Sequence, residues 1–152
     1  MVHIKNMKPL LIDIPFEQWN LKGLPSYRNK QIREWVYEKG LLDFEKMSNL
    51  PSGLRENLKK EWDLMPMELS KEQGSTDTTQ KFLWKLRDGQ LIESVLIPAT
   101  QGTKGVRASR LTLCVSTQVG CALGCKFCAS GLDGLKRNLT TGEILGQVIL
   151  AR

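Results

Sequence analysis

The pattern of hydrophobic and polar positions predicts helices in the first part of the chain. Apolar residues recur at helical spacing between Arg28 and Lys39, and Gly40 follows as a stop. A second helix is expected after Pro51, with Ser52 as its N-cap. The apolar stripes of both helices are predicted to face a core. These stripes are Ile32, Trp35 and Val36, and Leu54, Leu58 and Trp62; short helical turns are expected at residues 15–19 and 44–47.

The polar faces of these helices are basic. The simplest interpretation of such a face is that it only contacts solvent. The alternative interpretation is that it docks RNA. The whole chain has 22 Lys and Arg residues against 16 Asp and Glu residues, and its net charge of +6 suits a polyanionic partner such as RNA. The basic residues concerned are Arg28, Lys30, Arg33, Arg55, Lys59 and Lys60.

After the predicted helices, the pattern of apolar and polar residues changes from helical spacing to strict alternation. Residues 81–86 and 90–97 are predicted to be strands joined by a two-residue hairpin turn at Asp88-Gly89. A third strand is expected at residues 111–115. The segment before it, residues 101–109, is a basic loop whose glycines do not match a phosphate-binding P-loop.

Three cysteines follow the third predicted strand directly. Cys121, Cys125 and Cys128 form a C-x3-C-x2-C triplet, and Phe127 precedes the last of them. Three thiolates on one loop can hold three irons of a [4Fe–4S] cube and leave the fourth iron open for another ligand. A helix capped by residue 140 or 141 is expected to run to residue 152. Strand, metal loop and helix together indicate the first βα unit of a parallel β/α structure.

Zinc and disulfides are the competing interpretations of the cysteines. A structural zinc site needs four ligands. The further candidates are His3, which is distant along the chain, and Cys114, which would give an unusual spacing. Four cysteines would permit two disulfides in a secreted protein, but the N-terminus lacks an apolar signal segment. We therefore expect a cytoplasmic protein with reduced thiols and prefer the cluster interpretation.

The length and composition are those of a globular protein. Of the 152 residues, 41% are hydrophobic and 25% are charged, which allows one ordinary domain or two small ones. No apolar run approaches the roughly 18–20 residues that cross a bilayer, so no membrane association is expected. A full β/α barrel takes about 250 residues, and the chain is therefore expected to be truncated.

The cysteine triplet with Phe127 resembles that of the radical S-adenosylmethionine (SAM) enzymes. The longer segment from Leu113 through the triplet to Leu139 is similar to the RlmN/Cfr family of RNA methyltransferases. The resemblance covers nearly the whole chain in the family's order. Earlier pieces that resemble the family's accessory region and connecting hairpin are residues 25–28, 31–35, 50–51 and 92–95.

The resemblance implies an α+β chain in three parts. Residues 1–65 would be an N-terminal helical accessory domain that docks RNA. Residues 66–106 would be a β-hairpin connector and loop. Residues 107–152 would begin an incomplete radical SAM β/α barrel and carry the cluster loop.

The resemblance also implies a reaction. The family methylates adenosine at C2 in the RlmN branch, acting on 23S rRNA and tRNA, or at C8 in the Cfr branch. The implied cofactors are a [4Fe–4S] cluster and S-adenosyl-L-methionine, with a flavodoxin-type electron donor and a methyl-cysteine intermediate. A monomeric protein is expected.

Individual residues take roles from the same resemblance. Cys121, Cys125 and Cys128 would be cluster ligands, and Phe127 would lie beside the cofactor. Cys114 matches a second catalytic cysteine that helps to resolve a covalent protein–RNA adduct; the alternative is a small buried core thiol. Glu93 matches a carboxylate proposed as the base for the adenine proton, and the alternative is a solvent-facing hairpin residue.

Two expected features of the family have no counterpart in this sequence. No residue matches the methyl-carrying cysteine, and the Gly-Glu SAM-binding motif is absent. The chain is therefore expected to be inactive alone. Three hypotheses follow: the N-terminal portion of a C2 methyltransferase, a C8-methylating resistance enzyme, or an RNA-binding fragment without catalysis.

Overall fold

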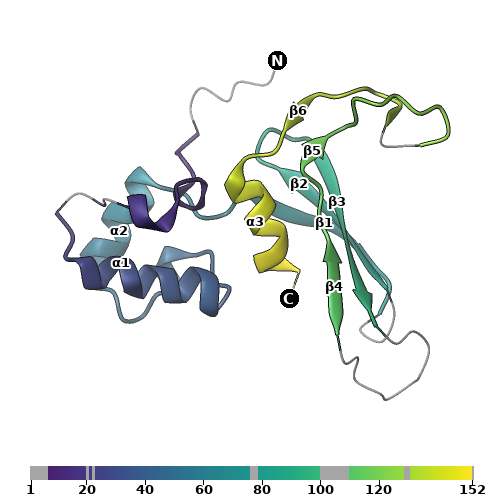
Figure 1. The fold of residues 1–152 in the computed structure, drawn as a ribbon. Coiled ribbons are helices and arrows are strands. Elements are labelled where there is room, and N and C mark those ends of the chain that lie inside the picture. The colour runs from purple at the N-terminus through teal and green to yellow at the C-terminus, as the bar shows by residue number, and fades with distance from the viewer. Residues whose placement is uncertain are drawn as a thin grey trace. The chain divides into compact units, whose positions relative to one another are not determined.

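The computed structural model describes residues 7–19, 21, 23–75, 79–99, 110–128 and 131–151. The chain is a mixture of helices and strands, and it divides into two compact units (Figure 1). A helical unit comprises Met1–Pro66 and Thr141–Leu150, and a sheet unit comprises Met67–Thr140. The predicted loop at residues 101–109 lies outside the described residues.

Within the described residues, the helical unit contains three α-helices and several single turns. Gly40, with φ 67°, follows the first helix as predicted. The last turn of that helix is π-helical, at Glu34–Glu38. The expected short turns are present as 3₁₀ helices. The bounds are α1 Ser26–Arg33, α2 Ser52–Glu61 and α3 Thr141–Leu150, with 3₁₀ turns at Leu11–Asp13, Phe16–Gln18 and Phe44–Lys46.

Ser52 is not the N-cap of α2, so that prediction is wrong. The cap position is held by Pro51, whose φ of −55° and ψ of 145° are non-helical, and Ser52 is the first helical residue. The carbonyl of Pro51 accepts the first bond of the helix, from the Arg55 amide at 3.1 Å. Proline suits this place because its φ is fixed and it has no amide hydrogen to satisfy.

The predicted apolar stripes form the core of the helical unit. Ile32 and Val36 of α1 are fully buried, and Leu58 of α2 is nearly so. The remaining stripe residues are partly buried against the same cluster. Ile149 of α3 belongs to this core as well. None of the helices in the described part of the chain has the length and hydropathy of a membrane span.

The N-terminus of α3 is held by a residue distant in sequence. The Gly142 amide donates to Asp13 Oδ1 at 2.7 Å. A side chain at position 142 would place its Cβ 2.8 Å from that oxygen. Glycine at this position therefore permits a close approach, and the Asp13 carboxylate satisfies an amide that has no partner within the helix.

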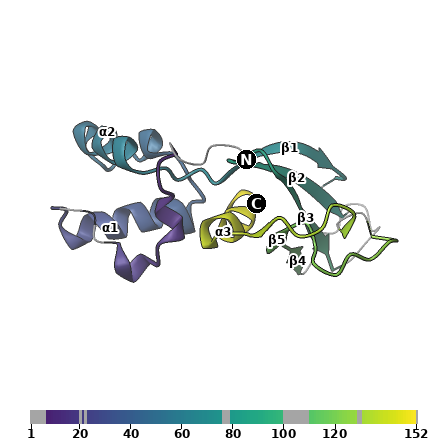
Figure 2. The same cartoon turned by 90° about the horizontal axis from the view of Figure 1, so that it is seen from above.

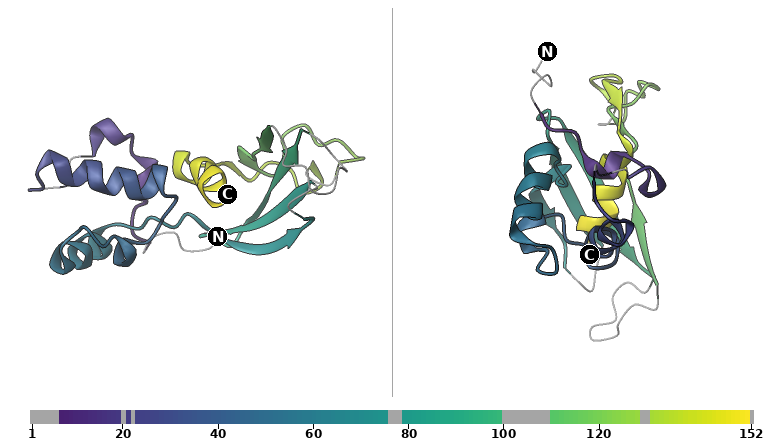
Figure 3. Two further views of the ribbon diagram at one scale, coloured as in Figure 1. Left: turned by 90° about the horizontal axis from the view of Figure 1, so that it is seen from below. Right: turned by 90° about the vertical axis from the view of Figure 1, so that its left-hand side faces the viewer.

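The sheet unit is built on four antiparallel strands in the order β1-β2-β3-β4 (Figure 2). The views in Figure 3 show that this sheet is twisted. The predicted strands are confirmed as β2, β3 and β4. All pairs between the named strands are antiparallel, so the parallel barrel unit stays a prediction. The strands are β1 Met67–Gln73, β2 Gln80–Leu86, β3 Leu91–Pro98 and β4 Leu111–Cys114.

The turn between β2 and β3 has three residues, and the predicted two-residue turn is wrong. Lys85 pairs with Leu91, and the Leu86 amide donates to the Gln90 carbonyl at 2.8 Å. Residues 87–89 therefore form the loop. Gly89 closes it with φ 84°, the left-handed conformation that such three-residue loops require.

One face of the sheet is buried and the other is exposed. On the buried face, the rings of Phe82 and Trp84 stack with centroids 5.5 Å apart. The Trp84 indole N–H donates to Ser94 Oγ at 2.9 Å, which satisfies both polar groups away from water. On the opposite face, Lys81 and Glu93 form an exposed ion pair at 2.9 Å.

Candidate cluster loop and catalytic face

The cysteine triplet lies on a loop whose two ends are joined. The loop spans residues 120–136, between strands β5, Gln118–Val119, and β6, Arg137–Asn138. These strands pair antiparallel, Gln118 with Asn138 and Val119 with Arg137 (Figure 1). Two more backbone bonds flank the ladder, from Lys136 to Val119 at 2.9 Å and from Leu139 to Thr117 at 2.8 Å. We call residues 117–120 and 134–139 the neck of the loop.

Glycines allow backbone segments to approach each other closely in the neck and in the loop. Gly120 has φ 76°, and a Cβ at this position would collide with the Gly134 carbonyl oxygen. Within the loop, a Cβ on Gly131 would come within 3.2 Å of the Cys125 amide nitrogen. A side chain at position 120 would therefore push the two backbone segments apart, whereas one at position 131 would require the neighbouring backbone to shift by a few tenths of an ångström.

The three cysteines are partly exposed thiols on this loop. All four cysteines of the chain are free. The Cys128 amide donates to the Cys125 carbonyl at 3.1 Å, which closes one turn of the loop. Across the part of the chain that the structure describes, no three Cys, His, Asp or Glu side chains gather closely enough to hold a metal ion. The donor set suits an iron–sulfur cluster, and its role as ligand stays a prediction.

Large apolar side chains point outward from the same loop. Phe127, predicted to lie beside the cofactor, is 93% exposed, and Leu123 is 82% exposed. Leu132 is also exposed. Apolar side chains gathered on one exposed segment are typical of a surface that binds a ligand or another part of a protein.

An ion pair fastens the neck to the β2–β3 turn. Arg137 Nε donates to Asp88 Oδ2 at 2.8 Å, and Arg137 Nη2 lies 2.7 Å from the same oxygen. The other carboxylate oxygen of Asp88 accepts from the Gln90 amide at 3.0 Å. No local sequence pattern signals this contact, because the two residues are 49 positions apart.

A pocket of about 340 Å³ lies between this turn and the neck. Gly89 of the turn, Gln90 and the first residue of β3, Leu91, line one side. The other side is lined by the neck and the cysteine loop, through Val119, Gly120, Asp133, Gly134 and Lys136.

Cys114 and Glu93 share one face of the sheet. Cys114 pairs with Val95 across β3 and β4, and Glu93 lies two residues before Val95. Directly opposed residues and residues two apart on a strand point to the same face. Cys114 is exposed, so the interpretation of it as a buried core thiol is wrong. Glu93 faces solvent and pairs with Lys81, and its role as a base stays a prediction.

Several basic residues of the helical unit are already paired within it. Arg28 donates to Gln31 and to the Asn49 carbonyl. Lys59 pairs with Glu45, and this hydrogen bond lowers the pKa of Glu45 and raises the pKa of Lys59. Both side chains of that pair are exposed, so its contribution to stability is small.

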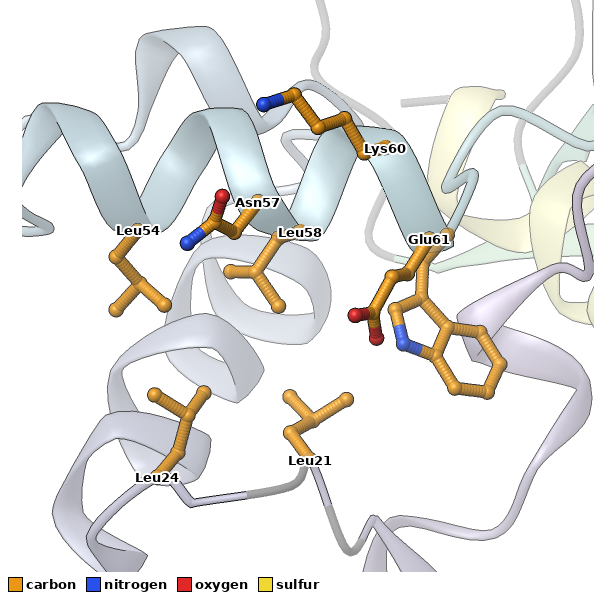
Figure 4. A pocket seen from close by; sticks show the side chains of 8 residues that line it. Leu21, Leu24, Leu54, Asn57, Leu58, Lys60 and Glu61 are labelled. Carbon is orange, nitrogen blue, oxygen red and sulfur yellow. The ribbon is translucent and has the colours of Figure 1, made fainter.

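The same unit holds a pocket of about 370 Å³ between α2 and the segment before α1. Apolar and polar side chains both line it, and Figure 4 shows Leu21 and Leu24 facing Leu54 and Leu58 of α2 across the gap. The polar lining residues belong to α2; they are Asn57, Lys60 and Glu61.

Comparison with known proteins finds the same family along most of the chain. Residues 17–64 match the family described as the ribosomal RNA large subunit methyltransferase N-terminal domain. A probable dual-specificity RNA methyltransferase RlmN from Akkermansia muciniphila is 52% identical over 129 residues, covering 85% of this chain and 36% of that protein. A dual-specificity RNA methyltransferase RlmN from Nitratiruptor is 42% identical over 147 residues, covering 93% and 41%.

A solved structure agrees with these relatives. The crystal structure of a radical SAM methyltransferase from Sphaerobacter thermophilus superposes with a TM-score of 0.80 and 40% identity, over 94% of this chain and 41% of that one. The fold of this chain is thus that of part of a radical SAM methyltransferase. The chain belongs to the RlmN family and corresponds to the N-terminal part of its members. It spans 36–41% of the length of these relatives.

Proposed function

We propose that the protein carrying this chain methylates adenosine C2 in 23S rRNA and tRNA by radical SAM chemistry. The observation that carries the proposal is a C-x3-C-x2-C loop within a chain that is 52% identical to a probable dual-specificity RNA methyltransferase over 129 residues. The free, partly exposed state of the three thiols supports a ligand role.

The proposal divides the work among the parts of the chain. Residues 1–65 form the accessory domain that docks RNA, residues 66–106 the hairpin connector, and residues 107–152 the start of the radical SAM barrel. The net charge of +6 supports RNA docking. Lys30 and Lys60 are exposed on the helical unit and are its best candidates for contacts with phosphates.

The chain's own residues supply ligands and proton transfer. Cys121, Cys125 and Cys128 would hold three irons of a [4Fe–4S] cluster and leave the fourth for SAM. When bound, the cluster supplies the electron that cleaves SAM to a radical. Phe127 would flank the cofactor.

The exposed face of the sheet would contact the target adenine. Glu93 would accept the proton from the adenine carbon that receives the methyl group, since a positioned carboxylate can act as a general base. Cys114 would help to release the RNA from its covalent adduct. The implied methyl-cysteine intermediate requires a further cysteine, to which no residue of this chain corresponds.

A flavodoxin-type donor, a monomeric state and a cytoplasmic location complete the proposal. A C8-methylating enzyme of the Cfr type is the alternative within the family. A non-catalytic RNA-binding fragment is the alternative outside it, and the net charge of +6 supports it.

The test is anaerobic cluster assembly in the whole protein that carries this chain. We expect about four irons per protein in the wild type and a loss of that iron in Cys125→Ala. Cys114→Ala is the matched control, because the same thiol is removed outside the triplet, and it should keep its iron. Chromatography of the methylated adenosine against 2-methyladenosine and 8-methyladenosine standards, with detection by mass spectrometry, then separates C2 from C8 methylation, because the two isomers have the same mass.

Two results would contradict the proposal. Iron binding that does not change in Cys125→Ala would show that the triplet is not the ligand set. Salt-dependent RNA binding without iron or methylation, equal in the wild type and Cys125→Ala, would favour the non-catalytic RNA-binding alternative.

A further inference from the structure

We propose that Arg137 and Asp88 are a positioning pair that holds the cysteine loop in register with the sheet. The inference rests on the proposed function, because it concerns where the three thiols stand relative to Glu93 and Cys114. Neither residue would touch the cofactor or the RNA. Their action would be exerted through the neck of the loop.

The pair is less exposed than three other ion pairs of the described residues. The Arg137 and Asp88 side chains are 29% and 10% exposed. In the pairs Arg33–Glu38, Lys59–Glu45 and Lys81–Glu93, each side chain is 46% exposed or more. A charge pair withdrawn from water is screened less and holds its geometry more firmly than a surface pair.

Each partner is fixed at its own end. Asp88 is held in the turn because its Oδ1 accepts from the Gln90 amide, which leaves Oδ2 directed at Arg137. Arg137 lies in β6 and pairs through its backbone with Val119, two residues before the first cysteine of the triplet. Arg137 Nη1 also donates to the Asn138 carbonyl at 3.2 Å. The guanidinium thus joins two segments that are otherwise far apart along the chain.

The ion pair links the part of the sheet that carries Glu93 and Cys114 to the loop that carries the cysteine triplet. Asp88 precedes β3, which carries Glu93 and pairs with β4, which carries Cys114. Arg137 follows the loop that carries the cluster ligands. Just before the neck, Ser116 Oγ also donates to the Glu93 carbonyl at 2.7 Å, which ties that end of the loop to β3. The Arg137–Asp88 ion pair ties the other strand of the neck, β6, to the turn.

The experiment compares Asp88→Asn, Arg137→Gln and the double variant in the whole protein, first without iron. The readouts are hydrogen exchange of the Lys136 and Leu139 amides, which bond across the neck, and alkylation of the three loop thiols. We expect about tenfold faster exchange and alkylation in each single variant. The reason is that the loss of a hydrogen bond to a charged group raises the population of the open neck by about tenfold or more. The double variant should show the same exchange and alkylation rates as each single variant.

Glu72→Gln is the matched control. Glu72 accepts a hydrogen bond from Gln80 on the same sheet, is exposed, and lies away from the neck. This control should leave exchange at the neck unchanged. In the iron-loaded protein, the two neck variants should also change the paramagnetic resonance signal of the cluster on addition of SAM, while Glu72→Gln should not.

Three outcomes would overturn the proposal. Unchanged exchange and alkylation in Asp88→Asn would show that the pair does not hold the neck. Additive effects in the double variant would show that the two residues act separately. Equal acceleration over every strand amide would show a general structural role. Because these readouts use iron-free protein, a failure of the wild type to bind iron would refute the proposed function alone.

Discussion

Glu93 and Cys114 project from the same exposed face of the sheet, one diagonal step apart. The pairing of Cys114 with Val95 sets this relationship, because Glu93 lies two residues before Val95 on β3. Diagonal neighbours across antiparallel strands have their Cα atoms about 7–8 Å apart. The proposed division into a base and a resolving thiol requires that one purine base lie over this face within reach of both side chains.

Replacement of Glu93 by Gln should abolish proton transfer while leaving the sheet intact. General bases contribute about 10²–10⁴-fold to rate, and we expect a loss in that range, measured as methyl incorporation into adenosine by the whole protein. Lys81→Gln is the control, because it breaks the same 2.9 Å ion pair and keeps the carboxylate. Equal losses in both variants would assign the effect to the ion pair.

Replacement of Cys114 by Ala should leave the RNA attached to the protein. The thiol is exposed, so its loss should change the stability of the sheet by no more than about 0.5 kcal/mol. The assay is the fraction of protein that carries covalently bound RNA after denaturation. Thr112→Ala, on the same strand and face, is the control and should release its RNA normally. Complete release from the Cys114 variant would contradict the proposed role.

Gly120→Ala should open the neck of the cysteine loop, whereas Gly134→Ala should not. Both glycines have positive φ, 76° and 66°, so each substitution costs about 1–2 kcal/mol in backbone strain. Only the new Cβ at position 120 meets another atom, the Gly134 carbonyl oxygen. We expect faster exchange of the Lys136 amide and lower iron content in the first variant. Equal exchange rates and iron contents in the two variants would show that the strain of a positive φ, and not the Cβ clash, opens the neck.

Ser94→Ala should destabilise the sheet because it leaves the Trp84 indole N–H without its buried acceptor. The donor and acceptor are 2.9 Å apart, and both residues are almost fully buried. An unsatisfied buried group costs about 1–3 kcal/mol, which hydrogen exchange of the β2 and β3 amides would measure. Ser70→Ala, at an exposed position on β1, should change little. A neutral result for Ser94 would show that another group or water satisfies the indole.

The helices and the central strands could be predicted because their periodic apolar residues face a core. Ile32 and Val36 are buried as expected, and so are Phe82 and Trp84. Strand β1 was missed because Met67 is its only buried residue, so its pattern does not alternate. It lies at the edge of the sheet, where charged residues are common.

The candidate site was predictable in its residues and not in its arrangement. The spacing of the cysteines predicts a donor set, but strands as short as β5 and β6 have no detectable period. The contact between Arg137 and Asp88, and that between Asp13 and Gly142, join residues far apart in sequence. Such contacts depend on the tertiary fold, and no local pattern encodes them.

Tyr37 should make the helical unit less stable at alkaline pH. Burial raises the pKa of Tyr37 above its ordinary value of 10.0, with Arg33 opposing the shift and Glu17 adding to it. The folded state therefore favours the neutral phenol. Stability is complete below the pKa of the unfolded chain and is lost as pH rises through the raised pKa of the folded state.

The measurement is an absorbance titration of phenolate formation, with the thermal stability of the iron-free whole protein followed over the same pH range. Tyr27→Phe is the matched control, because Tyr27 is 52% exposed and is the only other tyrosine of this chain. We expect the alkaline loss of stability to persist in Tyr27→Phe and to shrink in Tyr37→Phe. Identical alkaline profiles in the two variants would mean that the buried phenol is not the group responsible.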